Sequence, residues 1–197
     1  NTPTHSYMKF LYKYPQAAFP YVELAAENRR RQGQGLEYEL LDTGVFQDNR
    51  YFDIVIEYAK VDEEDLCIRI TAHNRGPDPA PVHLLPQLWF RNTWAWSDQP
   101  GREPTIVPGP RGADWLSLLA RDEGMETLAT VPMEYHLGPR CLYGPAGGRL
   151  LFTGNETNAD RVFGPEHLSR AAYVKDAFHR FIINGESACN PRPTGTK

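Results

Sequence analysis

The sequence lacks a long hydrophobic run and an excess of positive charge. None of its apolar stretches approaches the roughly 18 residues that a membrane-spanning helix needs, so no membrane partner is expected. The net charge at pH 7 is -4, which disfavours nucleic acid as a partner because the phosphate backbone requires a basic surface. A chain of 197 residues is long enough to bury a substantial core, about 70% of its unfolded surface.

Cysteine is also scarce. Cys67, Cys141 and Cys189 lie far apart and form no CxxC pair, so no disulfide framework is expected. This usage favours a reducing compartment, and we predict a cytoplasmic location. Cys67 falls within an apolar strand pattern, where a free, buried thiol is the expected state.

Motifs for nucleophilic catalysis, phosphate binding and metal binding are missing as well. The sequence contains no GxSxG elbow, and the glycines of 144–148 fit a turn rather than a phosphate-binding loop. His73 and His83 flank a turn-rich stretch and could lie across a strand pair, but a metal site needs a third ligand and none is apparent. The motifs therefore predict no catalytic residue, no cofactor and no metal.

The sequence is rich in period-two alternation, which is typical of half-buried strands. Strands are expected at Tyr51–Lys60, 66–72 and 82–90, forming an antiparallel meander, with Phe52, Ile54, Ile56 and Tyr58 on one face of the first. Further strands are expected at 36–41, 126–131, 134–137, 149–153 and 178–184. With 17 prolines and 16 glycines among short strands, the chain is predicted to be all-β, an antiparallel β-sandwich with one or two short helices.

The clearest predicted helix is Tyr21–Arg31. Glu23 and Glu27 stand early and Arg29 to Arg31 stand late, which suits the helix dipole, and Gly33 follows as a stop. The stretch 98–112 is rich in proline and glycine and predicts a long loop. The stretch 114–120 fits a short helix and a strand equally well.

Paired carboxylates are the requirement for glycoside hydrolysis. The candidates are Glu37, Glu39, Asp42, Asp53, Glu57, Glu156, Asp160 and Asp176. Glu37 and Glu39 share a predicted strand face, as do Asp53 and Glu57. Alternation alone makes such pairs common, so we interpret them as solvent-facing side chains rather than a catalytic pair.

Three of the four tryptophans lie in the run LLPQLWFRNTWAW, residues 84–96. Alternation would place Leu88 and Phe90 on one strand face and Trp89 on the other, with Trp94 and Trp96 sharing a face. Such a run fits a core, an interdomain seam or a sugar-stacking platform. Core and seam packing are favoured, because aromatic side chains dominate cores and interfaces in general.

Several longer segments together resemble glycoside hydrolase family 63, in particular large bacterial proteins similar to mannosyl-oligosaccharide glucosidase. The resemblance spans nearly the whole chain and weakens between residues 101 and 149 and around 166–170. It is carried by TPTHSYMK (2–9), LYKYPQ (11–16), EYELLDTGVF (37–46), RYFD (50–53), EYAK (57–60), HNRGP (73–77), LLP (84–86), LWFRNTW (88–94), NETN (155–158), YVKD (173–176) and TGTK (194–197).

This resemblance implies an N-terminal supersandwich of the galactose-mutarotase-like type joined to a C-terminal (α/α)6 barrel. The catalytic acid and base of the family, which act with inversion, belong to the barrel, and no part of this chain matches it. Residues 1–197 are then expected to form a single sandwich domain, a fragment of a larger chain. Its partners would be its own C-terminal catalytic domain and the oligosaccharide substrate of the parent.

The expected role is non-catalytic, namely buttressing the barrel and shaping its substrate cleft. The candidates for interdomain or sugar contact are Tyr7, Tyr12, Tyr14, Trp89, Arg91, Asn92, Trp94 and Trp96. One alternative is a carbohydrate-binding module in which Trp94 or Trp96 stacks on a sugar. A weaker alternative is an epimerase-like enzyme that pairs an acid with a histidine, the candidates being His73, His83 and His179.

Overall fold

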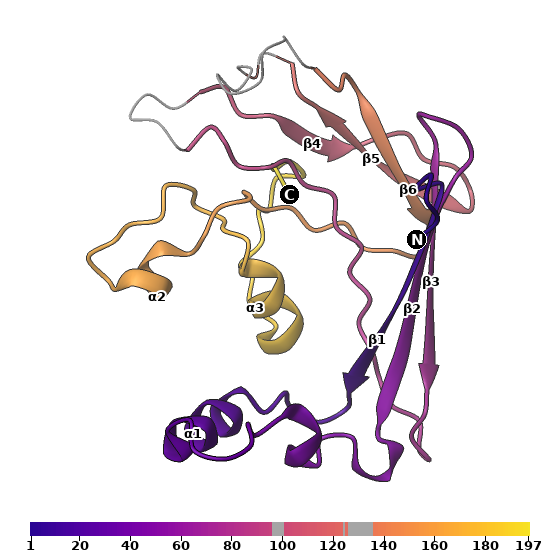
Figure 1. Ribbon diagram of the computed structural model, residues 1–197. Helices are drawn as coiled ribbons and strands as arrows, with labels where there is room; N and C mark the ends of the chain where they lie inside the picture. Colours follow the sequence, from indigo (N-terminus) through magenta and orange to yellow (C-terminus); the bar gives the residue numbers. More distant parts are fainter. Residues whose placement is uncertain (96–100, 124, 126–135) are drawn as a thin grey trace. The chain divides into compact units, whose positions relative to one another are not determined.

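The computed structural model describes residues 1–95, 101–123, 125 and 136–197. It is mostly β, with two antiparallel three-stranded sheets and a few short helices (Figure 1), which confirms the predicted all-β class. The chain divides into two compact units, Asn1–Leu84 and Leu85–Lys197, and each is described by itself. The sandwich type and the single domain stay predictions.

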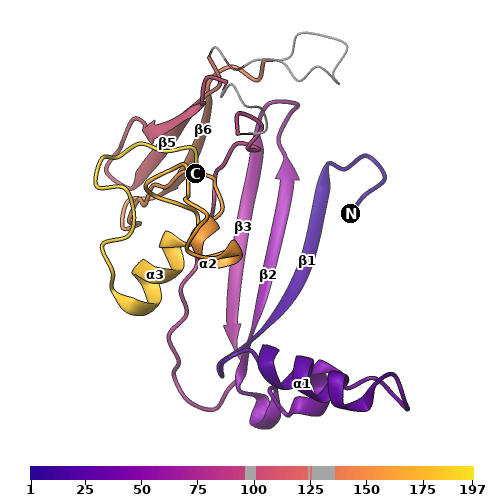
Figure 2. The ribbon, with the colours of Figure 1, turned by 90° about the vertical axis from the view of Figure 1, so that its left-hand side faces the viewer.

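The first unit contains a meander with strand β2 in its centre (Figure 2). Strands β1 (Tyr7–Pro15), β2 (Tyr51–Lys60) and β3 (Leu66–Asn74) pair in the order β1-β2-β3. The predicted strands at β2 and β3 are confirmed, but the third partner is β1 and not residues 82–90. β1 escapes a simple pattern because Tyr7 and Leu11 interrupt its alternation of large apolar residues with lysine.

The helices of the first unit follow β1. Helix α1 (Tyr21–Arg31) has the predicted bounds. The 3-10 helices η1 (Leu40–Thr43) and η2 (Gln47–Asn49) come next. The predicted strand at 36–41 is wrong, because Glu39 and Asp42 form a capping box that begins η1.

The second unit contains strands β4 (Thr105–Pro108), β5 (Trp115–Arg121) and β6 (Arg140–Pro145), paired in that order, and helices α2 (Ala159–Phe163) and α3 (Ala177–Asn184). The ambiguous stretch 114–120 is therefore a strand, the predicted loop 98–112 contains β4, and glycines 144–148 end β6 and enter a turn. The predicted strand at 178–184 is wrong, since its apolar residues also recur at helical spacing. The predicted strand at 126–131 lies wholly outside the described residues, and half of the one at 134–137 does.

Two other predicted strands, 82–90 and 149–153, form no ladder, and residues of both line the core of this unit. Ile106, Ala120 and Phe152 form the buried cluster, and Leu88, Phe90, Leu118 and Leu150 pack against it. The C-terminal segment closes this core from the side. Gly195 exchanges backbone hydrogen bonds with Ile106 at 2.7 and 3.1 Å, and Thr153 bonds with Thr196 and Lys197. The apolar content of both stretches thus reflects burial without strand pairing.

The three cysteines are free. The expectation that Cys67 is buried is wrong: it is exposed, because it lies on the edge strand β3, which is open on both faces at this point. In the part of the chain that the structure describes, no helix is long and apolar enough to cross a membrane.

Candidate functional site

The first sheet has two chemically different faces. Because side chains alternate along a strand, cross-strand partners share a face, and the register places Phe10, Ile56 and Ile70 in one row. The rows on this side contain almost only apolar and aromatic residues. We call it the apolar sheet face: Met8, Phe10, Tyr12, Tyr14, Phe52, Ile54, Ile56, Tyr58, Leu66, Ile68, Ile70 and Ala72.

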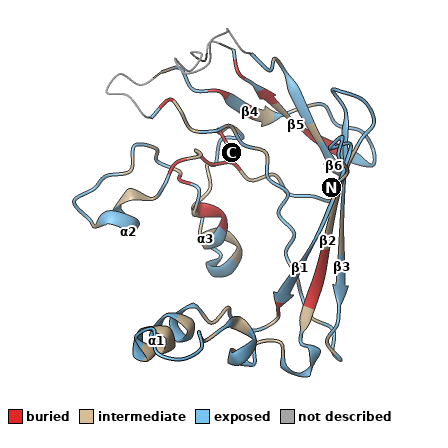
Figure 3. Ribbon diagram, in the orientation of Figure 1, coloured by how far each residue is buried: buried red, intermediate tan, exposed pale blue. Residues whose placement is uncertain are grey.

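The apolar sheet face is buried along the first half of β2 and open along both outer strands (Figure 3). Phe52 and Ile54 of the central strand are 3% and 7% exposed, whereas Phe10 is 54% exposed. Tyr12, Tyr14, Leu66 and Ile68 are also exposed. With about half of each side chain open, these five leave on the order of 400 Å² of apolar surface uncovered. This matches the largest patch of a typical monomer, which is often functional.

The opposite face carries two charged rows, and we call it the charged sheet face. Asp53 accepts hydrogen bonds from Lys13 Nζ and Arg75 Nε, each at 2.7 Å. These hydrogen bonds, of which that from Lys13 has the larger effect, hold the pKa of Asp53 below its usual range. Glu57 accepts from the Tyr7 hydroxyl at 2.5 Å and from Arg69 Nη2 at 2.7 Å, and both bonds lower its pKa in the same way.

The charged sheet face should lose stability in acid. Asp53 and Glu57 have lower pKa values in the folded chain than in the unfolded one, where they are about 3.9 and 4.3. Their contribution is therefore complete above about pH 5 and disappears as the pH falls through the folded pKa values. Urea unfolding followed by circular dichroism from pH 6 to 2 should show a falling midpoint for the first unit. A flat profile would contradict these ion pairs.

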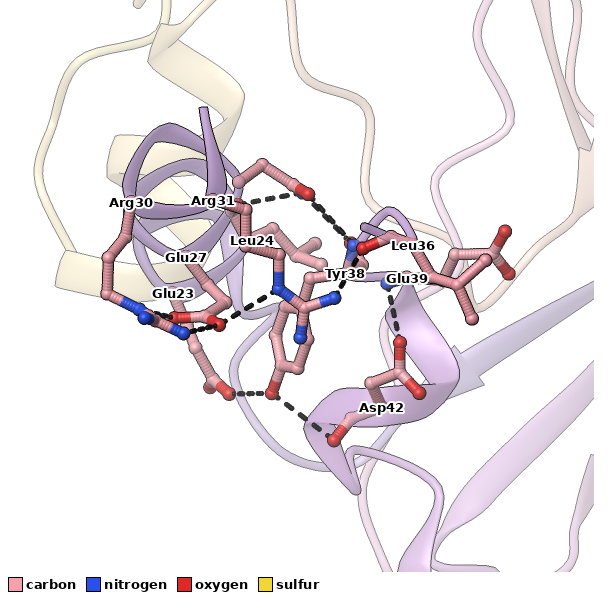
Figure 4. Close-up of polar contacts among 10 residues, drawn as sticks. Glu23, Leu24, Glu27, Arg30, Arg31, Leu36, Tyr38, Glu39 and Asp42 are labelled. Carbon is pink, nitrogen blue, oxygen red and sulfur yellow. Dashed lines mark hydrogen bonds and ion pairs between the residues drawn. The ribbon is translucent and has the colours of Figure 1, made fainter. Parts of the chain in front are cut away.

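Hydrogen bonds and ion pairs hold helix α1, the residues that follow it and η1 together (Figure 4). We call residues 21–43 the α1–η1 arm. The Asn28 side-chain amide pairs with both backbone groups of Tyr38: it accepts a hydrogen bond from the N–H at 2.8 Å and donates one to the C=O at 2.9 Å. The Tyr38 hydroxyl donates to Glu23 at 2.5 Å, and this bond raises the pKa of Tyr38 to about 12.

Ion pairs on α1 add to this lock. Glu27 accepts from Arg30 Nη2 at 2.6 Å and from Arg31 Nε at 3.0 Å, and these bonds lower its pKa to about 2. A hollow of about 380 Å³ lies beside Asn28 and Arg31. Both side chains already donate to atoms of the arm, Arg31 to the Leu36 carbonyl, so the hollow offers little for recognising a ligand.

The arm exposes apolar side chains while its polar groups are satisfied internally. Val22 is 83% and Leu36 is 87% exposed, and Tyr21 and Leu41 are similarly open. α1 itself has no buried residue. A helix without a fully buried residue gains little from packing, and tertiary packing is what normally stabilises a helix of this length. The arm therefore presents exposed apolar side chains that the rest of the first unit leaves largely uncovered.

The structure separates the three predicted tyrosines. Tyr12 and Tyr14 share the apolar sheet face, with ring centroids 6.2 Å apart. Tyr7 lies on the charged sheet face, where its hydroxyl bonds to Glu57. The sequence interpretation missed Phe10 as a site residue, although its alternation with Met8 and Tyr12 would have indicated the shared face.

Residues 85–95 of the tryptophan run belong to the second unit and form no strand, so the predicted strand is wrong. The predicted sides of residues 88–90 are confirmed, because Leu88 and Phe90 pack against the core while Trp89 is exposed. Trp94 is 3% exposed, and its indole Nε1 donates to Glu156 at 3.4 Å. Asn92 Nδ2 donates to the Asn155 carbonyl at 3.1 Å. Trp89 is 54% exposed and Arg91 is also exposed, whereas Trp96 lies outside the described residues. Trp94 packs in the interior and presents no open ring for a sugar.

The other candidates do not converge on a site. His73 lies opposite Asp53 and not opposite His83, and Asp53 is already engaged by two cations. Glu37 and Glu39 precede η1 and share no strand. Among the described residues, no group of three or more His, Cys, Asp or Glu side chains is arranged to hold a metal ion.

The chain is similar to a protein of Saccharomyces cerevisiae. It is 36% identical over 228 residues to the uncharacterized protein YMR196W, and the match covers 100% of this chain and 20% of the yeast protein. The chain thus spans about a fifth of the length of this relative. No protein-family model matches the chain, and no solved structure matches it.

Proposed function

We propose that the chain is a non-catalytic β-sandwich domain of a larger family 63-like glycoside hydrolase, of the galactose-mutarotase-like type, and that it acts in the cytoplasm. Its task is to support the catalytic domain of the same polypeptide and to shape the cleft that admits an oligosaccharide. The catalytic acid and base belong to that other domain.

The observation that carries this proposal is the open apolar sheet face. A three-stranded sheet becomes stable when its apolar face is covered by another layer. Here Phe52 and Ile54 of the central strand are buried, while Phe10 and Ile68 on the two outer strands are 54% and 44% exposed. The α1–η1 arm adds further open apolar side chains. Both surfaces have the composition of a domain core divided in two, which is typical of permanent interfaces.

The length of the yeast relative supports an intrachain partner. In that protein, about four fifths of the residues lie outside the region similar to this chain. Such a polypeptide has ample material to cover both apolar surfaces. The family resemblance of the sequence segments implies that this part of the polypeptide is a helical barrel with the catalytic acids.

Two neighbouring substitutions test the proposal in the intact longer protein. Phe10 and Leu11 are adjacent, 54% and 51% exposed, and lie on opposite sheet faces. Phe10→Asp should destabilise the intact protein by about 2–3 kcal/mol, since a buried apolar contact is replaced by a desolvated charge. Leu11→Asp should change it by less than about 1 kcal/mol.

Thermal unfolding and hydrolysis of α-glucosides provide the measurements. In the chain alone, the two variants should behave alike, because both side chains are half exposed there. Equal effects in the intact protein would show that nothing covers the apolar sheet face. If Phe10→Asp destabilises the intact protein more than Leu11→Asp does, but the protein hydrolyses no α-glucoside, the interface is supported and the glycosidase assignment is refuted.

A further inference from the structure

The outer face of the second sheet carries an aromatic pair that the proposed function does not use. Trp115 and Ser117 of β5 lie opposite Pro145 and Tyr143 of β6, so these side chains share a face. The alternate residues Leu116, Leu118 and Ala120 lie on the other side, where Leu118 and Ala120 pack in the core and Leu116 is buried. Trp115 is 39% and Tyr143 is 61% exposed.

The two rings form a corner. Trp115 and Tyr143 are diagonal neighbours across the strand pair, a position in which large side chains meet. Their ring centroids are 5.4 Å apart and the ring planes stand at 68°. One ring therefore acts as a floor and the other as a wall, while both remain open to solvent.

The corner is held in place by the turn before β5. The Gly112 N–H donates to the Trp115 carbonyl at 3.0 Å. A side chain at residue 112 would collide with the indole, since a Cβ there would lie 2.2 Å from Trp115 Nε1 and 2.6 Å from Cε2. Ser117 is 1% exposed, and its hydroxyl donates to the Pro110 carbonyl at 2.7 Å. The ring thus lies against the glycine backbone and is supported by a fixed strand.

The size and charge of the corner narrow the choice of ligand. The open parts of the two rings amount to about 200 Å², whereas a stable protein interface covers about 800 Å² on each partner. Stacked nucleobases would bring phosphates to a chain with a net charge of -4, which disfavours nucleic acid. A ligand of one or two neutral rings with an apolar face fits both limits.

We propose that Trp115 and Tyr143 bind a pyranose unit of a neutral oligosaccharide. The C–H face of the sugar rests on one ring, its edge meets the other, and its hydroxyls stay in water. Such an open site without an enclosing pocket gives weak binding, with a Kd on the order of 1 mM. The inference does not depend on the proposed function, because it concerns another sheet and another unit.

Proton–nitrogen NMR of the indole groups tests this directly, with maltohexaose and mannohexaose as probes. The chain has four tryptophans, and one indole signal should shift progressively with millimolar sugar. Trp115→Ala should abolish the shift and weaken binding at least tenfold. Gly112→Ala should weaken it although both rings are retained, because the indole is displaced. Trp89→Ala, which removes another exposed tryptophan, should bind as the original chain does.

Circular dichroism of each variant verifies folding, and Tyr143→Phe, which keeps the ring, should retain most of the affinity. No shift with either sugar, or a shift that persists in Trp115→Ala, would overturn the proposal. A response to choline chloride but not to sugar would also overturn it, because the corner would then be a cation site. None of these results bears on the apolar sheet face.

Discussion

Replacing Trp94 with alanine is expected to destabilise the second unit by about 3–5 kcal/mol, the usual cost of removing a buried tryptophan. The indole is 3% exposed, so its removal leaves a cavity that the surrounding backbone cannot easily fill. Glu156, which is 8% exposed, would also lose the indole donor and keep Arg170 Nε at 3.8 Å. Guanidinium unfolding monitored by circular dichroism measures the change.

Two variants divide this loss into its parts. Trp94→Phe keeps most of the volume and removes the 3.4 Å hydrogen bond, so it should cost clearly less than the alanine variant if packing dominates. Trp89→Ala serves as the matched control, because Trp89 is 54% exposed in the same run. Losses of similar size for Trp89→Ala and Trp94→Ala would contradict the placement of Trp94 in the interior.

Gly195→Ala should have the second large effect, about 3 kcal/mol. A Cβ at this position would lie 2.3 Å from the Thr153 carbonyl oxygen and 3.0 Å from two further backbone atoms of Thr153. Backbone atoms cannot rotate away, so the C-terminal segment must leave its place. It would lose the paired hydrogen bonds with Ile106 and those that link Thr153 to Thr196 and Lys197.

Amide hydrogen exchange provides the local readout of this displacement. The N–H groups of Ile106 and Thr153 should exchange much faster in Gly195→Ala than in the original chain. Gly147→Ala is the control, because nothing lies within 4 Å of a Cβ at Gly147, and its stability should hardly change. Unaltered protection at Ile106 would show that the C-terminal segment does not close the core.

The sequence predicted elements well where one physical signal acted alone. Helix α1 has acids at its start and arginines at its end, and β2 alternates from Phe52 to Tyr58 with Val55 as its single interruption. Prediction failed where apolar residues are buried for another reason. Residues 149–153 line the core without a ladder, and the apolar residues of α3 fit two periods. The spacing of apolar residues along the chain indicates which residues are buried. Only the tertiary arrangement decides how the backbone of those residues satisfies its hydrogen bonds.

The candidate site shows a different limit. The apolar face of β2 and β3 follows from alternation, and the family resemblance indicates Tyr12 and Tyr14. The openness of Phe10 and Ile68 could not be predicted, because exposure depends on which layer covers a face, and alternation does not contain that information. Trp94 shows the converse, since an aromatic in a polar setting proved to be interior.

The native thiols can be used to detect local unfolding, because the three cysteines differ in exposure. Cys67 and Cys141 are exposed, one in each unit, and Cys189 is partly buried. Burial raises the pKa of the Cys189 thiol, so less of it is present as the reactive thiolate. A maleimide reagent would therefore modify one cysteine of each unit in the native state. It would reach the third mainly when the second unit opens, without any engineered label.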